Sequence, residues 1–465
     1  MKNKTIRDFA NYALGDLFVK GFLFISLPLL SRILDPAEYG KLSIINTAIM
    51  ILYVFVSLNL QNAITNRYML TAENFGDYFK SILVFILPFQ VALLILSPLY
   101  SGFASGLLGI DSKDFLWVLI ICIMLSYLYM YTCYLQASRQ SGLYVKINML
   151  SKILEITLIF AFAYFMTSQQ YMSKIYSQLI VTAFILVYLS RKLIFLATGR
   201  VKVLYIKEAL VFSIPLIVHV LSNSLLSQAD RIIINNSLGS SAAGIYSFTY
   251  NISTGILVLI MAWNSSWQPR LYNHIENNRL NKIREITKAS TVIIFSVSSL
   301  AILFSREMIM LIAEKSYFSG IKILPIVIIG NAIIHLYLIY VNFIFYKKKS
   351  ILISTATLLA VMVNVGLNYL LIPILGILGS AWATVFSYLL LTILHYITST
   401  YIVVNNPLSA KYIIYFPCGL IIMYLLSILV DSNCSYLIGI MIKFIMMIVI
   451  GLVIIKTRVH KSLSE

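Results

Sequence analysis

Residues 321–346, with the sequence IKILPIVIIGNAIIHLYLIYVNFIFY, decide the fold of this chain. The stretch contains a single charged residue, Lys322 near its start, and three lysines follow it at 347–349. A helix needs about 20 mostly apolar residues to cross the hydrocarbon core of a bilayer. Lipid cannot satisfy exposed backbone polar groups, so a segment of this kind crosses as a helix. The stretch therefore predicts a transmembrane helix.

The same pattern recurs along the whole chain. Of its 465 residues, 60% are hydrophobic and only 11% are charged, which is unlike a soluble domain. We predict an all-α polytopic membrane protein with about fourteen transmembrane helices. The expected spans are 12–34, 41–63, 79–101, 114–136, 143–166, 173–196, 207–238, 243–267, 290–312, 321–346, 350–373, 376–401, 411–430 and 435–455.

The net charge of +18 follows the predicted topology and does not indicate a nucleic-acid partner. Basic residues gather before the first span, after the last span and in every second loop, which is the positive-inside pattern. This pattern predicts a multi-pass membrane protein with both termini in the cytoplasm. The histidines and cysteines have no metal-ligand or redox spacing, and no glycine-rich phosphate loop occurs, so we expect no metal and no cofactor.

A weak internal repeat divides the chain. Leu34, Gly40 and Ser43 after the first span recur at a constant offset as Leu238, Gly244 and Ser247 after the seventh. An even number of spans separates the copies, so they share one orientation in the membrane. We therefore expect two pseudo-symmetric six-helix lobes, at 1–200 and 201–401, followed by two additional C-terminal helices and a tail at 402–465.

Charged and polar side chains lie inside the predicted spans. A charge at mid-membrane costs about 2.5–3.5 kcal/mol on insertion scales, so such residues usually face a protein interior or a watery cavity. The candidates for a cationic, substrate-binding cavity are Lys20, Lys152, Arg231, Arg270 and Lys443, with Arg32 and Arg67 at its mouths. Candidates for ion coupling are Asp16, Glu155, His219 and Asp230, and a polar cavity face is expected at Asn148, Asn223, Asn251 and Asn364.

A second interpretation of these residues stays open. Polar side chains also join neighbouring helices by hydrogen bonds in membrane bundles. Helical spacing lets Asp16 pair with Lys20, and Lys152 with Glu155, as neutral structural pairs. Lys443 has no carboxylate three or four residues away, so it needs a partner from outside its own helix.

Three stretches carry a resemblance to a known family: LDPAEYG at 34–40, QADR at 228–231 and NYLLIPILGILGSAWAT at 368–384. The chain resembles the polysaccharide flippases of the Wzx type, whose superfamily includes multidrug and toxin extruders and lipid II flippases. The resemblance implies a V-shaped two-lobe bundle whose central cavity opens alternately to either side.

The resemblance also implies a function and partners. It implies a flippase that moves a polyprenyl-pyrophosphate-linked oligosaccharide, such as an O-antigen or capsule repeat unit, to the outer leaflet with an ion gradient. Lipopolysaccharide or other polysaccharide biosynthesis would be its pathway. Its partners would be that lipid-linked oligosaccharide and membrane lipids, with a polysaccharide polymerase and a chain-length regulator as further candidates.

Three alternatives remain. A cation-coupled multidrug exporter of the same fold is disfavoured, because the cations inside the spans at least match the anions. A lipid II flippase stays closer. A membrane enzyme, such as a polysaccharide polymerase or ligase, usually carries a large external loop with catalytic residues, and this sequence has none. We therefore do not expect an enzyme.

Overall fold

The computed structural model describes residues 2–403 and 406–456, and within them it leaves out the side chains of 2–14, 16, 17, 20 and 453–456. The chain divides into two compact units, Met1–Gly244 and Ile245–Glu465.

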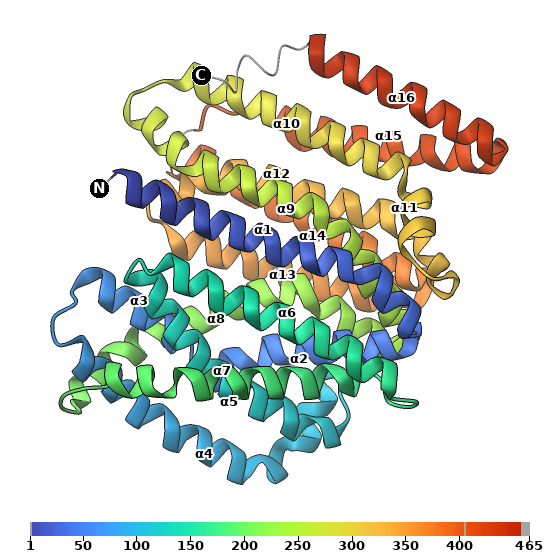
Figure 1. The fold of residues 1–465 in the computed structure, drawn as a ribbon. Helices are drawn as coiled ribbons and strands as arrows, with labels where there is room; N and C mark the ends of the chain where they lie inside the picture. Colours follow the sequence, from blue (N-terminus) through green and yellow to red (C-terminus); the bar gives the residue numbers. More distant parts are fainter. Residues whose placement is uncertain (1, 404–405, 457–465) are drawn as a thin grey trace. The chain divides into compact units, whose positions relative to one another are not determined.

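The described residues are helical almost throughout (Figure 1). The first unit contains α1 (Lys2–Ile33), α2 (Pro36–Val56), α3 (Leu60–Leu70), α4 (Phe75–Leu108), α5 (Ser112–Ala137), α6 (Ser141–Phe165), α7 (Met172–Leu196) and α8 (Val203–Leu238). The long helix α9 (Ser240–Glu276) begins in the first unit and belongs to the second from Ile245 onward. The second unit continues with α10 (Leu280–Leu303), α11 (Ser305–Ile312), the 3₁₀ helix η1 (Lys315–Lys322), α12 (Leu324–Tyr346), α13 (Ser350–Leu375), α14 (Ile377–Ile397), the π-helical η2 (Thr398–Val403), α15 (Lys411–Asn433) and α16 (Tyr436–Lys456).

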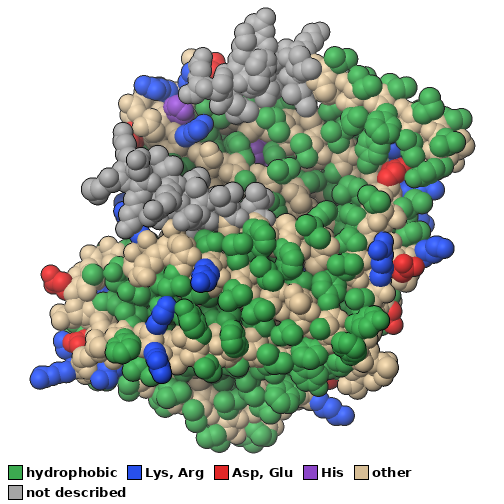
Figure 2. Space-filling view, viewed as in Figure 1, with side chains coloured by type: hydrophobic (Ala, Val, Ile, Leu, Met, Phe, Trp, Pro, Cys, Tyr) green, Lys and Arg blue, Asp and Glu red, His purple; other side chains and the backbone are tan. Residues whose placement is uncertain are grey.

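The membrane-protein architecture is confirmed. Within the described residues, twelve helices are long and apolar enough to cross a bilayer, and two shorter apolar stretches, Gly21–Ile33 and Tyr436–Leu452, lie in α1 and α16. Hydrophobic side chains cover much of the face seen in Figure 2. Such a surface is expected where lipid rather than water surrounds the helices.

In the first unit, α2 and α5 form the centre. In an apolar 18-residue stretch of each helix, 67% of the residues are buried in α2 and 61% in α5, compared with 22% in α4 and in α7. The helix α5 packs against α2, α3, α4 and α7, while α6 packs against α1 and α7. Buried Phe79, Ile82 and Met130 join α4 to α5. The outer helices keep one face against this core and turn the other outward.

In the second unit, α12 is the central helix. In an apolar 18-residue stretch of this helix, which lies within 321–346, 94% of the residues are buried. It packs against α10, α14 and α15, and α14 also packs against α13. The C-terminal helix α16 packs against α10 and α15. A helix that is apolar all round is thus buried on all sides.

The second expected span, 41–63, is wrong as one continuous helix. The helix α2 ends at Val56, and α3 starts at Leu60. Between them, Leu58 and Asn59 have φ values of 48° and 56°, in the left-handed region, which interrupts the helix. The Asn59 amide oxygen accepts hydrogen bonds from the side chains of Gln61 at 3.0 Å and Asn62 at 2.7 Å. Asparagine tolerates this backbone conformation better than most residues, because its side chain bonds locally.

Several other span limits differ from the expected ones. The helices α4 and α9 are longer than the spans 79–101 and 243–267, and the span 290–312 is divided between α10 and α11. Hydropathy finds the lipid-crossing part of a helix and misses its extension into the polar region. The helix α8 packs against α2, α3 and α4 inside the first unit. The division into lobes at residue 200 therefore stays a prediction, while the compact units divide at residue 244.

The repeat has a structural counterpart at its two glycines. In the first unit, a Cβ atom added to Gly40 would lie 1.9 Å from the Ser240 carbonyl oxygen and 3.0 Å from the Gly244 nitrogen. A Cβ added to Gly244 would lie 1.8 Å from the Pro36 carbonyl oxygen and 2.9 Å from the Gly40 nitrogen. The equivalent positions of the two copies thus meet backbone to backbone. Only glycine permits this approach.

Candidate functional site

A buried ion cluster joins two neighbouring helices of the first unit. The Lys152 ammonium of α6 donates to the Glu155 Oε2 atom at 2.8 Å. The Glu155 Oε1 atom accepts from the Lys174 ammonium, which comes from the first turns of α7. The side chains of Glu155 and Lys174 are 8% and 5% exposed, whereas that of Lys152 is 37% exposed. We call these three residues the Lys152 cluster.

Among the side chains that the structure describes, the Lys152 cluster has an excess of one positive charge, because a single carboxylate serves two ammonium groups. Lys152 lies roughly 16 Å from the start of α6 at about 1.5 Å per residue, close to the middle of a helix long enough to span. A charge at this depth is tolerated against protein or water but not against lipid. The spacing predicted the Lys152–Glu155 pair correctly.

Lys174 is the member that the sequence did not indicate as part of a site. It stands at the start of the expected span 173–196, where the sequence alone indicates a residue that borders a loop. A Lys at a helix end normally reaches toward water. Here the Lys174 side chain is buried and its ammonium group pairs with Glu155 of α6. Ser173 and Ser177, beside it on α7, are also buried. Only the packing of α6 against α7 reveals this position.

Aromatic side chains lie beside the Lys152 cluster. Tyr129 of α5 interacts electrostatically with both Lys152 and Glu155, and its side chain is 39% exposed. The Tyr53 ring of α2 packs edge-on against Tyr129, with 5.2 Å between ring centroids. Tyrosine presents both an apolar ring and a hydroxyl group, so this position suits contact with a partly polar ligand.

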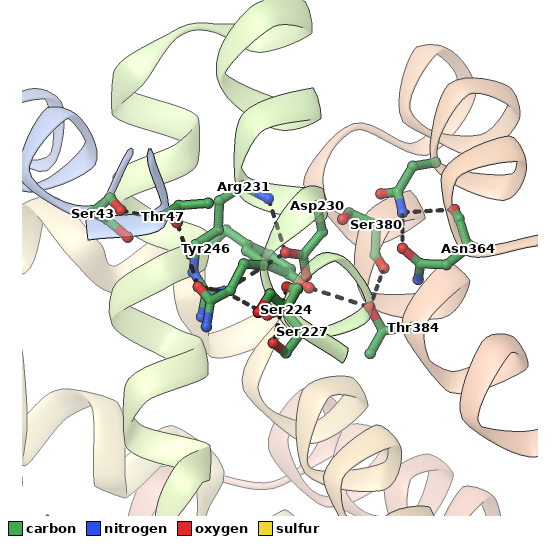
Figure 3. Close-up of polar contacts among 12 residues, drawn as sticks. Ser43, Thr47, Ser224, Ser227, Asp230, Arg231, Tyr246, Asn364, Ser380 and Thr384 are labelled. Carbon is green, nitrogen blue, oxygen red and sulfur yellow. Dashed lines mark hydrogen bonds and ion pairs between the residues drawn. The ribbon is translucent and has the colours of Figure 1, made fainter. Parts of the chain in front are cut away.

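Asp230 and Arg231 lie buried in the first unit, within α8 (Figure 3). The Arg231 guanidinium donates to the Ser227 carbonyl oxygen at 2.7 Å and to the Gln228 side-chain oxygen, and it lies 3.8 Å from Asp230. Thr47 of α2 donates to the same Gln228 oxygen at 3.4 Å. The side chains of Arg231 and Asp230 are only 4% and 3% exposed. This geometry joins α8 to α2 and suits a structural role.

The polar face of α8 continues toward the start of the helix. The His219 ring nitrogen and the Asn223 amide nitrogen lie 3.2 Å apart, and Ser227 donates to the Asn223 carbonyl oxygen at 3.1 Å. Asn223 is exposed, and His219 and Ser227 are partly exposed. His219, Asn223, Ser227 and Asp230 thus form a stripe on α8 that runs from partly exposed residues to a buried end.

Arg67 lies between α3, α4 and α8. Its guanidinium is 5.5 Å from the Tyr78 ring centroid and 5.3 Å from that of Tyr205. It also donates to the Glu208 carboxylate at 3.3 Å. Its side chain is 18% exposed. Two aromatic faces and a carboxylate hold the cation in one position. This fits a structural contact between helices better than a position at the mouth of a cavity, and we call Arg67, Tyr78, Tyr205 and Glu208 the clasp.

A loop before α8 is anchored beside this clasp. The Lys202 ammonium lies 2.9 Å from the Asp77 carboxylate, and the Asp77 Oδ1 atom accepts from the Arg200 backbone nitrogen at 2.9 Å. Lys80 donates to the Gly199 carbonyl oxygen at 2.8 Å. The hydrogen bond to Asp77 raises the pKa of Lys202 above its ordinary value. These contacts fix the entry of the chain into α8.

A small polar pocket lies at another end of the first unit. It has a volume of about 200 Å³ and is lined mainly by residues of α2, α5 and the turns between helices, including Lys41, Asp111, Asp114, Tyr171 and Asn235. The Lys41 ammonium stands 5.0 Å from the Tyr171 ring centroid, and Tyr171 is hydrogen-bonded to Asp114. Burial and the charge of Asp114 raise the pKa of Tyr171. Charges of both signs thus line the pocket.

Lys443 in the second unit finds the outside partners that its own helix lacks. Its ammonium donates to both Glu307 carboxylate oxygens, at 2.8 and 3.0 Å, and lies 2.8 Å from Asp431. The Lys443 side chain is 0% exposed. Arg306 lies 3.8 Å from Asp431 and faces the Tyr436 ring at 5.6 Å. Two cations and two carboxylates balance, so this cluster leaves no excess charge for a ligand.

Polar side chains in the second unit are mostly bonded within it. The Asn368 amide donates to the carbonyl and side-chain oxygens of Asn364 at 2.9 and 3.2 Å. The hydroxyls of Tyr246 and Thr384 lie 3.5 Å apart (Figure 3). The Asn331 amide of α12 donates to the Ser253 hydroxyl of α9 at 2.7 Å. Asn364 is buried and its contacts with Asn368 lie within α13, which favours a structural role over an open cavity face.

The remaining predicted residues lie apart from these clusters. Arg32 in the first unit and Arg270 in the second are exposed, and Asn251 is partly exposed. Asn148 donates to the Tyr144 carbonyl oxygen of its own helix at 3.1 Å. Asp16 and Lys20 lie in α1, and their side chains fall outside the described residues. Within the part of the chain that the structure describes, no three His, Cys, Asp or Glu residues form a group suited to a metal ion.

Residues 5–274 match the model of the polysaccharide biosynthesis protein family. The chain belongs to this family. The match covers more than half of the chain and includes the Lys152 cluster, Arg67 and Arg231. This family member is also 24% identical to the Lsg locus putative protein 1 of Haemophilus influenzae, over 81% of this chain and 95% of the relative.

Solved structures show the same fold. The inward closed conformation of the lipid II flippase MurJ matches with a TM-score of 0.68 and 14% identity, over 95% of this chain and 98% of MurJ. The MATE transporter VcmN of Vibrio cholerae matches with a TM-score of 0.57 and 15% identity, over 84% of this chain and 95% of VcmN. The fold of this family member is therefore that of these membrane flippases and transporters.

Proposed function

We propose that this protein moves a polyprenyl-pyrophosphate-linked oligosaccharide repeat unit from the cytoplasmic to the outer leaflet of the bacterial inner membrane. Membership of the polysaccharide biosynthesis protein family supports the pathway. The flippase and transporter fold supports the type of activity. The cargo is the part that the residues of this chain have to explain.

The observation that carries the proposal is the Lys152 cluster. It holds an excess positive charge halfway along a membrane-spanning helix, and its most exposed member is a lysine. An ammonium group attracts phosphate and acidic sugars as a point charge. A carrier of cationic drugs would gain nothing from such a group. We therefore assign the contact with the pyrophosphate to Lys152, with Lys20 and Arg270 as further candidate contacts.

Transport by alternating access needs a driving force. We propose that an ion gradient supplies it, with Glu155, His219 and Asp230 as coupling candidates in the described part of the chain and Asp16 as a further one. His219 is partly exposed, and histidine side chains take part in the proton relays of membrane pumps and transporters. Both chain termini would lie in the cytoplasm, and a polymerase and a chain-length regulator would use the product.

A deletion strain of the source bacterium tests the proposal. We expect loss of the surface polysaccharide and accumulation of lipid-linked repeat units, with both restored by the wild-type gene. Lys152→Met should restore little, whereas Lys146→Met, an exposed lysine on the same helix, should restore fully. Normal surface polysaccharide in the deletion strain would contradict the proposal.

The same strain separates the alternatives. Increased sensitivity to cationic drugs with unchanged polysaccharide would indicate a multidrug exporter. Rescue of cells depleted of their own lipid II flippase would indicate that cargo instead. We expect neither result.

A further inference from the structure

The two lysines of the Lys152 cluster have different surroundings. Glu155 accepts from both of them, one on each carboxylate oxygen. Lys174 is 5% exposed and Glu155 is 8% exposed, so these two form a buried pair between α7 and α6. Lys152 is 37% exposed and comes from the turn of α6 before Glu155. A ligand can therefore reach Lys152 but not Lys174.

The charges determine what this arrangement can bind. If Lys174 were absent, Glu155 would neutralise Lys152 fully, and the site would present no net charge to an anion. With Lys174 in place, the carboxylate is shared and one positive charge remains in excess. The interaction between two charges is several times stronger at the low effective dielectric of a protein interior than in water. The buried lysine thus controls the charge that the exposed lysine presents.

We propose that Lys174 is a positioning residue, which neutralises Glu155 and so leaves Lys152 its positive charge for the phosphate groups of the cargo. The inference rests on the proposed function and deepens it, because it names the atoms that take the pyrophosphate and the residue that prepares them. Glu155 keeps the two ammonium groups together, and Lys174 never contacts the cargo. Binding then depends on the net charge of the cluster rather than on each lysine separately.

Four variants of the full-length protein change this charge in steps. Lys152→Met and Lys174→Met each bring the cluster to zero. Glu155→Gln raises it by one, and the double variant Lys174→Met with Glu155→Gln returns it to the wild-type value. The matched control is Lys146→Met, which removes an exposed lysine from the first turns of α6 without changing the cluster.

The measurement is binding of inorganic pyrophosphate, and separately of a polyprenyl pyrophosphate, to the purified protein in detergent by calorimetry. We expect Lys152→Met and Lys174→Met to weaken binding about tenfold or more, which corresponds to about 1.4 kcal/mol. The double variant should return to within about threefold of the wild type, which corresponds to less than about 0.7 kcal/mol. A polyprenol without phosphate should show no dependence on the variants.

The double variant makes the inference falsifiable even if Glu155→Gln alone fails to fold with two unpaired lysines. Wild-type affinity in a folded Lys174→Met protein would overturn the inference. A folded double variant that binds pyrophosphate as weakly as Lys174→Met would also overturn it. If Lys174 had only a structural role, removing the charge of Glu155 would not restore binding.

The inference and the proposed function fail in distinguishable ways. If the wild-type protein restores surface polysaccharide in cells but binds neither pyrophosphate compound, the inference is overturned and the proposed function stands. If binding follows the charge of the cluster while the deletion strain keeps its polysaccharide, the anion site is supported and its cargo is a different phosphorylated lipid. A response to inorganic pyrophosphate and polyprenyl pyrophosphate alike supports recognition of the phosphate groups alone.

Discussion

Individual charged residues of this protein are held by partners from distant parts of the chain. Lys443 meets Glu307 and Asp431, Lys174 meets Glu155, and Arg67 meets Glu208. Each charge in a membrane-spanning segment needs such a partner, because lipid offers none. The partners decide which cations remain available to a ligand. Among these three cations, only Lys174 belongs to a cluster with positive charge to spare.

Lys443→Met should destabilise the second unit. It leaves the Glu307 and Asp431 carboxylates without the ammonium group between them, and loss of one partner from a buried pair costs about 3–5 kcal/mol. Unfolding in mixed micelles with increasing SDS measures the change. Lys411→Met, an exposed lysine at the start of α15, is the control and should change little. Equal stability of the two variants would rule out the structural role of this cluster.

Arg67→Lys tests the clasp of α3, α4 and α8. The variant keeps the charge but loses the flat guanidinium that lies over Tyr78 and Tyr205. We expect a loss of about 1–2 kcal/mol in the free energy of unfolding. Arg200→Lys, whose exposed side chain precedes the same helix, should have no effect beyond the error of the measurement. If both variants unfold alike, the contacts with the tyrosine rings contribute nothing.

At the scale of helices, two features depend on backbone conformation rather than on hydropathy. The left-handed residues Leu58 and Asn59 separate α2 from α3. The glycines Gly40 and Gly244 allow α2 and the start of α9 to touch. The sequence repeat contained both glycines, yet nothing in the sequence indicated that the copies contact each other. Close approach at small residues is a common packing device in membranes.

Gly40→Ala should disrupt this contact. The added Cβ would lie 1.9 Å from the Ser240 carbonyl oxygen, which is backbone and cannot move aside alone. Gly106→Ala in α4 is the matched control, because a Cβ there meets nothing within 4 Å. We expect a clear fall in the unfolding temperature for Gly40→Ala and almost none for Gly106→Ala. The fall would reflect a loss of about 1–3 kcal/mol in the free energy of unfolding, which is typical of an overpacked core. Equal melting of the two would show that α2 and α9 do not approach closely.

For the whole molecule, hydropathy predicted the membrane fold and most helices, because lipid imposes a minimum length and an apolar surface on each span. Local spacing predicted the Lys152–Glu155 pair, because residues three apart share a helix face. It missed Lys174 and the partners of Lys443, because those contacts arise only when helices pack. It also suggested cavity roles for Arg231 and Asn364, which lie buried among polar partners within their own units.

The proposed activity is transport of a polyprenyl-pyrophosphate-linked oligosaccharide across a bilayer. Proteoliposomes with this lipid in both leaflets test it directly, by the fraction of oligosaccharide that a membrane-impermeant glycosidase removes. Without the protein, the inner-leaflet half should stay protected. With wild-type protein the protected fraction should fall toward zero, while Lys152→Met should leave most of it intact. Protection that persists with folded wild-type protein under an imposed ion gradient would contradict the account.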